Sequence, residues 1–237
     1  EDQFYQRLQH DPVHPATIQP SPQDFATAYQ KLCQEAEGIV SIHISSKLSG
    51  TCNSAQQGRE MLTNKCPIEV IDSQLLSMAL GLIVIAAARV ANAGGTMAQV
   101  VAETKKVMPD THLLGLLDTL KYVALGGRIG KAKQLLGSVL NVKPLLTLKG
   151  GEVMPAGQAR SRSKGIERLS EFVQNASGID DLAIVYNTTP DEAELLKERI
   201  SGTYAKERIT TARIGPMLGV HMGPGALIVC LRGKLPK

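Results

Sequence analysis

The sequence contains no tryptophan, and aromatic residues make up only 3% of its 237 residues. Proteins that bind single-stranded nucleic acid stack the bases on aromatic side chains, so this scarcity argues against that class of function. The net charge is only +4, and the basic residues are scattered along the chain. Without a basic stripe, DNA binding is not expected either. Any cavity in such a protein must be lined mainly by aliphatic side chains.

Long apolar runs and closely paired cysteines are also missing. The longest apolar run, residues 79–88, has ten residues, whereas a membrane-spanning helix needs about 20. The run therefore predicts a buried helix, and no signal peptide is visible. The four cysteines (Cys33, Cys52, Cys66 and Cys230) form no C-x-x-C pair, so we expect reduced, mostly buried thiols in a cytoplasmic protein. No set of side chains has metal-site spacing, and we expect neither a metal nor a cofactor.

Strand-like and helix-like segments alternate along the chain, which predicts an α/β protein with helices covering both faces of a parallel sheet. The length suits two modest domains. We expect residues 1–110 to form a mostly parallel sheet flanked by helices, and residues 111–237 to form a mixed α/β domain with a hairpin around Gly150 and Gly151. The predicted strands are 38–44, 67–72, 111–118, the hairpin 142–157, 181–187, 207–215 and 225–231. The predicted helices are 2–9, 21–36, 50–63, 78–92, 96–109, 119–125, a glycine turn and helix over 126–140, 162–175, and one that starts at Thr189.

Three polar residues have the sequence context of helix N-caps. Ser21 and Thr189 are each followed by proline and, three residues on, by an acid, which predicts capping boxes. Thr96 follows two glycines and precedes a helical pattern. The segment 215–225 holds four glycines and two prolines, so we expect an irregular loop between the last two strands.

Ser49, Gly50 and Thr51 lie at a predicted strand-to-helix turn. The first amides of a helix lack intrahelical acceptors, and the helix dipole places partial positive charge there. A hydroxyl beside such amides forms a cradle for a carboxylate or a phosphate. Two other interpretations stay open: Ser49 simply caps the helix, or it is a nucleophile. The hydrolase motif G-x-S-x-G lacks its first glycine in "KLSGT", which weakens the nucleophile hypothesis.

Two further segments invite a comparison with known motifs. In "LGGRIGKAK", Leu125 and Ala132 stand where a P-loop requires glycine and a hydroxyl residue, so ATP binding is not expected. Arg128 in this segment is predicted to lie on the surface or to brace the domain junction. His221 lies between glycines in "GVHMGPG", where an imidazole is either structural or able to donate to an anion or move a proton.

Taken together, the segments resemble the DegV family. The resemblance rests on "TIQPSP", "ISSKLSGTCNSA", "VIDS", "LKYVALGGRIGKAKQLLGSVLNVKPLLTLKGGEV" and "IGPMLGVHMGPGALIV", and it covers essentially the whole chain. Two departures stand out. Ile18 replaces a serine of the family pattern, and the family's N-terminal strand and Asp-Ser turn are absent from this chain. We therefore expect the first domain to be N-terminally incomplete.

The resemblance implies a bacterial protein, not itself an enzyme, that buries one long-chain fatty acid with its carboxylate between the domains. It also implies a partner, an ATP-dependent fatty acid kinase subunit, which would convert the carboxylate to an acyl phosphate for phospholipid synthesis. The carboxylate-binding residues carried over by motif position are Thr17, Ser49 and His221, with Gly50, Thr51 and Arg128 as weaker candidates. The main alternative is a serine hydrolase or acyltransferase that uses Ser49 and His221. A third hypothesis is a regulatory interaction module with an incidental cavity.

Overall fold

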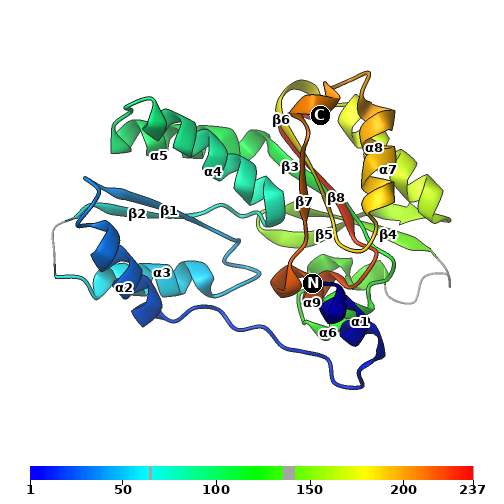
Figure 1. Ribbon diagram of the computed structural model, residues 1–237, viewed down its shortest axis with the longest axis horizontal. Helices are drawn as coiled ribbons and strands as arrows, with labels where there is room; N and C mark the ends of the chain where they lie inside the picture. The colour runs from blue at the N-terminus through cyan, green and yellow to red at the C-terminus, as the bar shows by residue number, and fades with distance from the viewer. Residues whose placement is uncertain (64–65, 136–141, 237) are drawn as a thin grey trace.

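The computed structural model describes residues 1–63, 66–135 and 142–236, which form two lobes (Figure 1). In the first lobe, two parallel strands lie between helices, with α2 and α3 on one side of the sheet and α4 and α5 on the other. The parallel register runs from Ile39 opposite Ile68 to His43 opposite Asp72. The elements of this lobe are α2 (Pro22–Leu32), β1 (Ile39–His43), α3 (Thr51–Glu60), β2 (Ile68–Asp72), α4 (Ser77–Asn92) and α5 (Met97–Val107).

The second lobe is built on a six-stranded sheet with the order β5-β4-β3-β8-β6-β7, in which only β6 and β7 are parallel. Its elements are β3 (Thr111–Leu116), β4 (Lys143–Lys149), β5 (Glu152–Ala159), α7 (Arg162–Gln174), β6 (Ser177–Tyr186), α8 (Pro190–Ile200), β7 (Thr210–Arg213) and β8 (Leu227–Lys234). Two α/β units, one parallel and one mixed, confirm the predicted fold class.

The two faces of the large sheet bury different cores because successive side chains of a strand point to opposite faces. Leu114 and Leu116 of β3 pack with residues of α7 and α8. Leu113 and Leu117 belong to a second core shared with α4. Helix α4, predicted as a buried helix, therefore joins the lobes by covering the sheet of the second lobe with the apolar stripe that contains Leu82 and Ile83.

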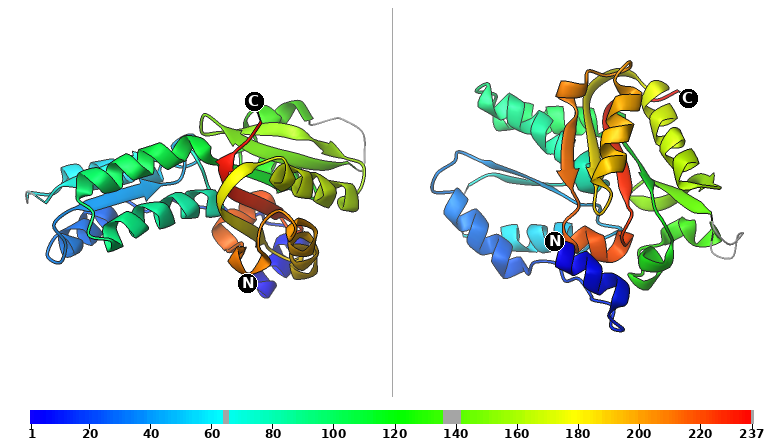
Figure 2. Two further views of the ribbon diagram at one scale, coloured as in Figure 1. Left: turned by 90° about the horizontal axis from the view of Figure 1, so that it is seen from above. Right: turned by 45° about the vertical axis from the view of Figure 1, so that its right-hand side comes forward.

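Short helices complete the fold: α1 (Asp2–His10), α6 (Lys121–Leu125), α9 (Pro216–Met222) and the 3-10 turns η1 (Met108–Asp110), η2 (Gly130–Leu135) and η3 (Lys206–Arg208). Helix α1 lies against α9 (Figure 2), and the buried Tyr5 hydroxyl donates to the Ile214 carbonyl at 2.6 Å. The first helix of the chain therefore packs on the second lobe. Part of the helix predicted over 126–140 lies outside the described residues.

The helix caps differ in outcome. Ser21 and Thr96 cap their helices as predicted, each in a reciprocal capping box. Helix α2 ends at Leu32, earlier than the expected residue 36. At α8 the capping box is not formed, because the Thr189 side chain makes no cap hydrogen bond and its hydroxyl oxygen is buried without a partner.

Two further predictions are wrong. Segment 215–225 contains the helix α9, with Pro216 at its first position and Gly223 after its last residue at φ 69°. Proline at a helix start and a left-handed glycine just past its end are the usual boundary signals, so the helix is consistent with its sequence. The second error concerns the cysteines. The sulfur atoms of Cys33 and Cys66 are bonded to each other, and only Cys52 and Cys230 are free thiols, both buried.

A charged cluster joins α4 to the large sheet at the far end of the helix. Arg89 forms two hydrogen bonds to the Asp181 carboxylate, at 3.0 and 2.9 Å, and Arg232 forms two more, at 2.9 and 2.7 Å. The Asp181 side chain is only 12% exposed. Across residues 1–63, 66–135 and 142–236, no helix combines the length and apolar character that a membrane crossing needs.

Candidate functional site

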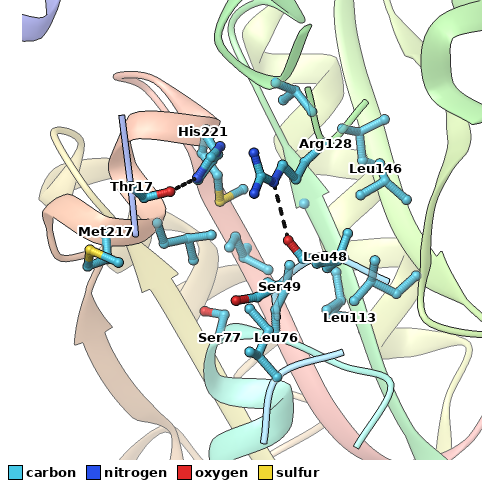
Figure 3. Close-up of a pocket in the computed structure, with 18 of the residues that line it drawn as sticks. Thr17, Leu48, Ser49, Leu76, Ser77, Leu113, Arg128, Leu146, Met217 and His221 are labelled. Carbon is cyan, nitrogen blue, oxygen red and sulfur yellow. Dashed lines mark hydrogen bonds between the residues drawn. The ribbon is translucent and has the colours of Figure 1, made fainter. Parts of the chain in front are cut away.

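A cavity of about 360 Å³ lies between the two lobes (Figure 3). Its walls come from the pocket-facing side of the large sheet, from α9, and from the loops that follow β1 and β2. Most of the lining is aliphatic, including Leu48, Leu76, Leu113, Leu146, Met217 and Ile228. No Asp or Glu among the described residues lines it. The cavity therefore suits an apolar guest whose polar group is neutral or negative.

The polar groups of the cavity include Thr17 and His221, which are joined by a hydrogen bond. Thr17 Oγ1 lies 2.9 Å from His221 Nε2. Thr17 comes from the extended segment between α1 and α2, whereas His221 lies in the last turn of α9. Figure 3 shows both side chains at the same end of the pocket, close to Arg128. Helix α9 holds the backbone of His221 in a fixed position, which the predicted glycine loop would not do.

Ser49 lies at the start of α3, where Gly50 occupies the N-cap position. Ser49 Oγ lies 2.8 Å from Thr51 Oγ1 and accepts a hydrogen bond from the Thr51 backbone N–H at 3.3 Å. The hydroxyl thus satisfies one helix amide, which is part of a capping role, while both hydroxyls line the cavity. Gly50 does not line it. A Cβ at Gly50 would lie 2.7 Å from the Gln19 amide nitrogen, so glycine lets the Gln19 side chain approach the turn.

Arg128 braces the lobe junction, one of the two places predicted for it. Its Nε donates to the Leu48 carbonyl at 3.2 Å, and one terminal nitrogen donates to the Gly126 carbonyl at 2.7 Å. A second contact across the junction joins Ser45, fully buried, to the tip of the β4–β5 hairpin, where its hydroxyl donates to the Gly151 carbonyl at 2.7 Å. The pocket is therefore closed by contacts between residues far apart in the chain.

The surroundings of His221 favour a neutral imidazole. Burial, together with the nearby Arg128 and His14, lowers the pKa of His221 below its usual value. Its Nδ1 is buried and has no hydrogen-bond partner in the part of the chain that the structure describes, and Gly126 lies so close that a Cβ there would be 2.2 Å from this nitrogen. In a Ser-His-acid triad, a carboxylate orients the imidazole, and the imidazole contacts the serine. Among the described residues, His221 forms a hydrogen bond with neither a carboxylate nor Ser49.

Ser77 is a pocket residue that sequence reasoning missed. It is the first residue of α4, and Figure 3 shows its hydroxyl on the same side of the pocket as that of Ser49. Ser77 and Gln74 have φ of 55° and 58° and are the only non-glycine residues with positive φ in the described part of the chain. Such a backbone costs roughly 1–3 kcal/mol. The sequence feature that could have identified Ser77 is a serine between a parallel strand and an apolar helix.

The sequence and the fold were compared with known proteins. The family model of the DegV family, whose members are called uncharacterised proteins, matches residues 1–234. A DegV domain-containing protein of Streptomyces coelicolor is 38% identical over 223 residues, which are 92% of this chain and 78% of the relative. A DegV domain-containing protein of Deinococcus radiodurans is 34% identical over 221 residues, with the same two coverages.

Solved structures match over almost the whole chain. A DegV family protein from Thermus thermophilus with fatty acid binding has a TM-score of 0.90 and 32% identity, and the match covers 98% of this chain and 84% of that one. DegV from Bacillus subtilis, a fatty acid binding protein, has a TM-score of 0.85 and 26% identity with the same coverages. Both solved structures therefore share the two-lobed fold described above.

Proposed function

The chain belongs to the DegV family, and from this premise we propose that it binds one long-chain fatty acid in the cavity between its lobes. The observation that carries the proposal is an aliphatic cavity whose polar groups are hydroxyls, the Gln19 carboxamide, an imidazole and a guanidinium, with no acid among the described lining residues. In this proposal Thr17, Ser49 and His221 hold the carboxylate. Thr51 and Arg128, which line the same cavity, and the amide beside Gly50 assist them.

The chemistry of these groups supports a bound carboxylate. A buried charge is costly unless it is paired or hydrogen-bonded. Hydroxyls and helix-terminal amides donate such bonds, and Arg128 adds a positive charge at the same end of the cavity. An acyl chain of about 16 carbons, at about 0.8 kcal/mol for each buried CH₂ group, contributes on the order of 10 kcal/mol before ordering costs. The aliphatic walls supply that term.

The finer part of the proposal concerns the fate of the carboxylate. The protein would act in the bacterial cytoplasm as a carrier, without catalysis of its own, and present the carboxylate to a separate ATP-dependent kinase subunit. That subunit would form an acyl phosphate for phospholipid synthesis. Holding one carboxylate oxygen at His221 while the other faces the phosphate donor is a positioning role that needs no covalent step. The absence of a P-loop pattern in "LGGRIGKAK" agrees with ATP being bound elsewhere.

The test begins with the purified protein, which is denatured and extracted so that released lipid is identified by mass spectrometry. We expect about one long-chain fatty acid per chain, because an apolar cavity binds an apolar guest better than water. Ser49→Ala and Thr17→Val should each weaken fatty acid binding by about 1–3 kcal/mol, since each removes a donor to a charged acceptor. Ser163→Ala and Thr211→Val, on the exposed surface away from the cavity, are matched controls that should bind as the wild type does.

Three outcomes would contradict the proposal. Extracts with no fatty acid, combined with no saturable binding, would favour an interaction module. Unchanged affinity in both site variants, or equal binding of fatty alcohols and methyl esters, would move the carboxylate away from Thr17 and Ser49. Covalent labelling of Ser49 by a fluorophosphonate that is lost in His221→Ala would favour a hydrolase. For the carrier, His221→Ala should keep the acyl chain bound and impair mainly acyl-phosphate formation when a kinase subunit and ATP are supplied.

A further inference from the structure

Gly115 has no local structural reason to be glycine. It is buried at the penultimate position of β3, between two leucines. Buried glycines elsewhere in the described chain either have positive φ, as Gly223 does, or lie where a Cβ would meet another atom closer than 3.4 Å, as Gly165 does against Leu116. Gly115 meets neither condition. Because glycine in a strand lowers stability relative to alanine, its presence points to a use for the space.

The space beside Gly115 opens into the cavity. Gly115 lines the pocket together with Leu113 and Leu117, the residues two positions before and after it on the same face of the sheet. A Cβ at Gly115 would lie 3.7 Å from Ile228 Cγ1, 3.8 Å from Met222 Cε and 3.8 Å from the Leu146 carbonyl oxygen. These are ordinary contact distances, so a single methyl group would fit. The wall of leucine and isoleucine therefore has a recess about the size of a methyl group.

The shape of this recess bears on which guest fits best. A straight polymethylene chain has a uniform width and lies along a wall without entering a recess in it. An acyl chain with a cis double bond or a methyl branch departs sideways at one point and fills such a recess. Filling it restores contacts that the bare wall lacks. The Met222 side chain at its border is flexible enough to adjust to the guest.

Resting on the proposed function, we propose that Gly115 is a specificity-determining residue that selects long-chain fatty acids with a lateral bend or branch over straight chains of the same length. The bend or branch of the acyl chain occupies the volume that a methyl group at position 115 would fill. The carboxylate contacts at Thr17, Ser49 and His221 come from other elements, so the choice of chain shape and the binding of the head group are separable.

The test compares five acids that share an 18-carbon main chain and differ in the shape of that chain. Oleate and cis-vaccenate carry a cis bend, 10-methylstearate carries a branch, and elaidate and stearate are straight. The wild type should bind at least one bent or branched acid about 10-fold more tightly than elaidate and stearate, since a methyl-sized fit in an apolar pocket is worth about that factor. Gly115→Val should lose this preference by weakening the bent and branched acids while stearate stays within about 3-fold.

Two further variants control for folding. Gly115→Ala adds one carbon at ordinary contact distances, so it should fold, raise the melting temperature of the lipid-free protein by about 1–3 °C, and reduce the preference part of the way. Gly202→Val places the same atoms on an exposed turn with no neighbour within 4 Å and should leave the preference unchanged. A comparison of the cis-unsaturated acids with 10-methylstearate shows whether the recess binds a cis bend or a methyl branch.

Two results would overturn the inference alone. They are a wild type that binds elaidate and stearate as tightly as every bent or branched acid, and a Gly115→Val or Gly115→Ala variant that weakens all five acids equally. A folded wild type that binds none of the five would instead reject the proposed function, and the role of Gly115 with it.

Discussion

At the scale of single residues, His221 shows how burial determines the protonation state of a side chain. Its Nε2 contacts Thr17, its Nδ1 has no partner, and its pKa is lowered by burial and by Arg128 and His14. In the lipid-free protein the imidazole is therefore neutral near pH 7. A carboxylate bound beside it would favour the protonated form, because an opposite charge within a few ångströms raises the pKa of a histidine.

Fatty acid affinity should therefore depend on pH. If the bound carboxylate raises the pKa of His221, the complex holds more protons than the free protein, and the affinity rises as the pH falls from 8 to 6. NMR titration of the imidazole should give a higher pKa for His221 with the ligand than without it. His221→Gln should remove most of the pH dependence. An equal pKa in both states would place the carboxylate away from His221.

At the scale of elements, α9 is a seven-residue helix that carries His221 and three other pocket residues, Met217, Leu218 and Met222. A helix this short is not stable alone and depends on its packing. It packs on α6 and on α1. A Cβ at Gly219 would lie 2.6 Å from the Tyr5 hydroxyl, so glycine is what lets α9 and α1 meet. The position of the imidazole thus depends on a helix more than 200 residues earlier in the chain.

Gly219→Ala tests this packing, because two effects oppose each other. Alanine is better than glycine in a helix by about 1 kcal/mol. The clash with Tyr5 costs about 1–3 kcal/mol by overpacking and disturbs the Tyr5–Ile214 hydrogen bond, worth about 1 kcal/mol. We expect a net loss of about 1–3 kcal/mol in denaturant unfolding and faster proteolysis of α1. Gly202→Ala, on an open turn, is the matched control. A variant more stable than the wild type would show that α1 and α9 adjust freely.

Some features of these elements could be predicted from the sequence, and others could not. The caps at Ser21 and Thr96 were predictable because their hydrogen bonds join residues three positions apart. Thr17, Ser49, Thr51, Arg128 and His221 were chosen from motifs, and the structure brings all five to one cavity. The Cys33–Cys66 bond and the contact of α1 with α9 were missed because each depends on long-range packing, whereas α9 was missed although Pro216 and Gly223 mark its two ends. Gly115 was missed because its meaning lies in its neighbours on β4, β8 and α9.

At the scale of the whole molecule, α4 connects the pocket to the charged cluster. Ser77 at its first turn lines the cavity, while Arg89, twelve residues later and about 18 Å away along the helix, binds Asp181. Burial by itself raises the pKa of Asp181, but hydrogen bonds from Arg89 and Arg232 outweigh it and hold the pKa below its usual value. The ionised carboxylate thus anchors the first lobe to the sheet of the second.

Asp181→Asn should destabilise the fold by about 3 kcal/mol at pH 7, because it leaves two guanidinium groups without their buried partner. A carboxyl whose pKa is lowered on folding contributes stability above its unfolded pKa of about 3.9, and this is lost as the pH falls through the folded value. The difference from wild type should therefore shrink below pH 4. Asp180→Asn is the matched neighbour: its side chain is 63% exposed, and the change should cost less than about 1 kcal/mol. Equal losses in both variants at every pH would contradict the anchor.

In the hydrogen bonds that close the pocket, the donor and the acceptor are different kinds of group. Arg128 and Ser45 each donate from a side chain, but the acceptors at Leu48 and Gly151 are main-chain carbonyls. A carbonyl is present whatever the residue type, so natural selection acts on the side chain of the donor and only on the backbone path of the acceptor. As the family diverges, these pairs will show little covariation although they hold the molecule together. Covarying residue pairs would therefore identify contacts within the cores of this protein but few of the contacts that close its pocket.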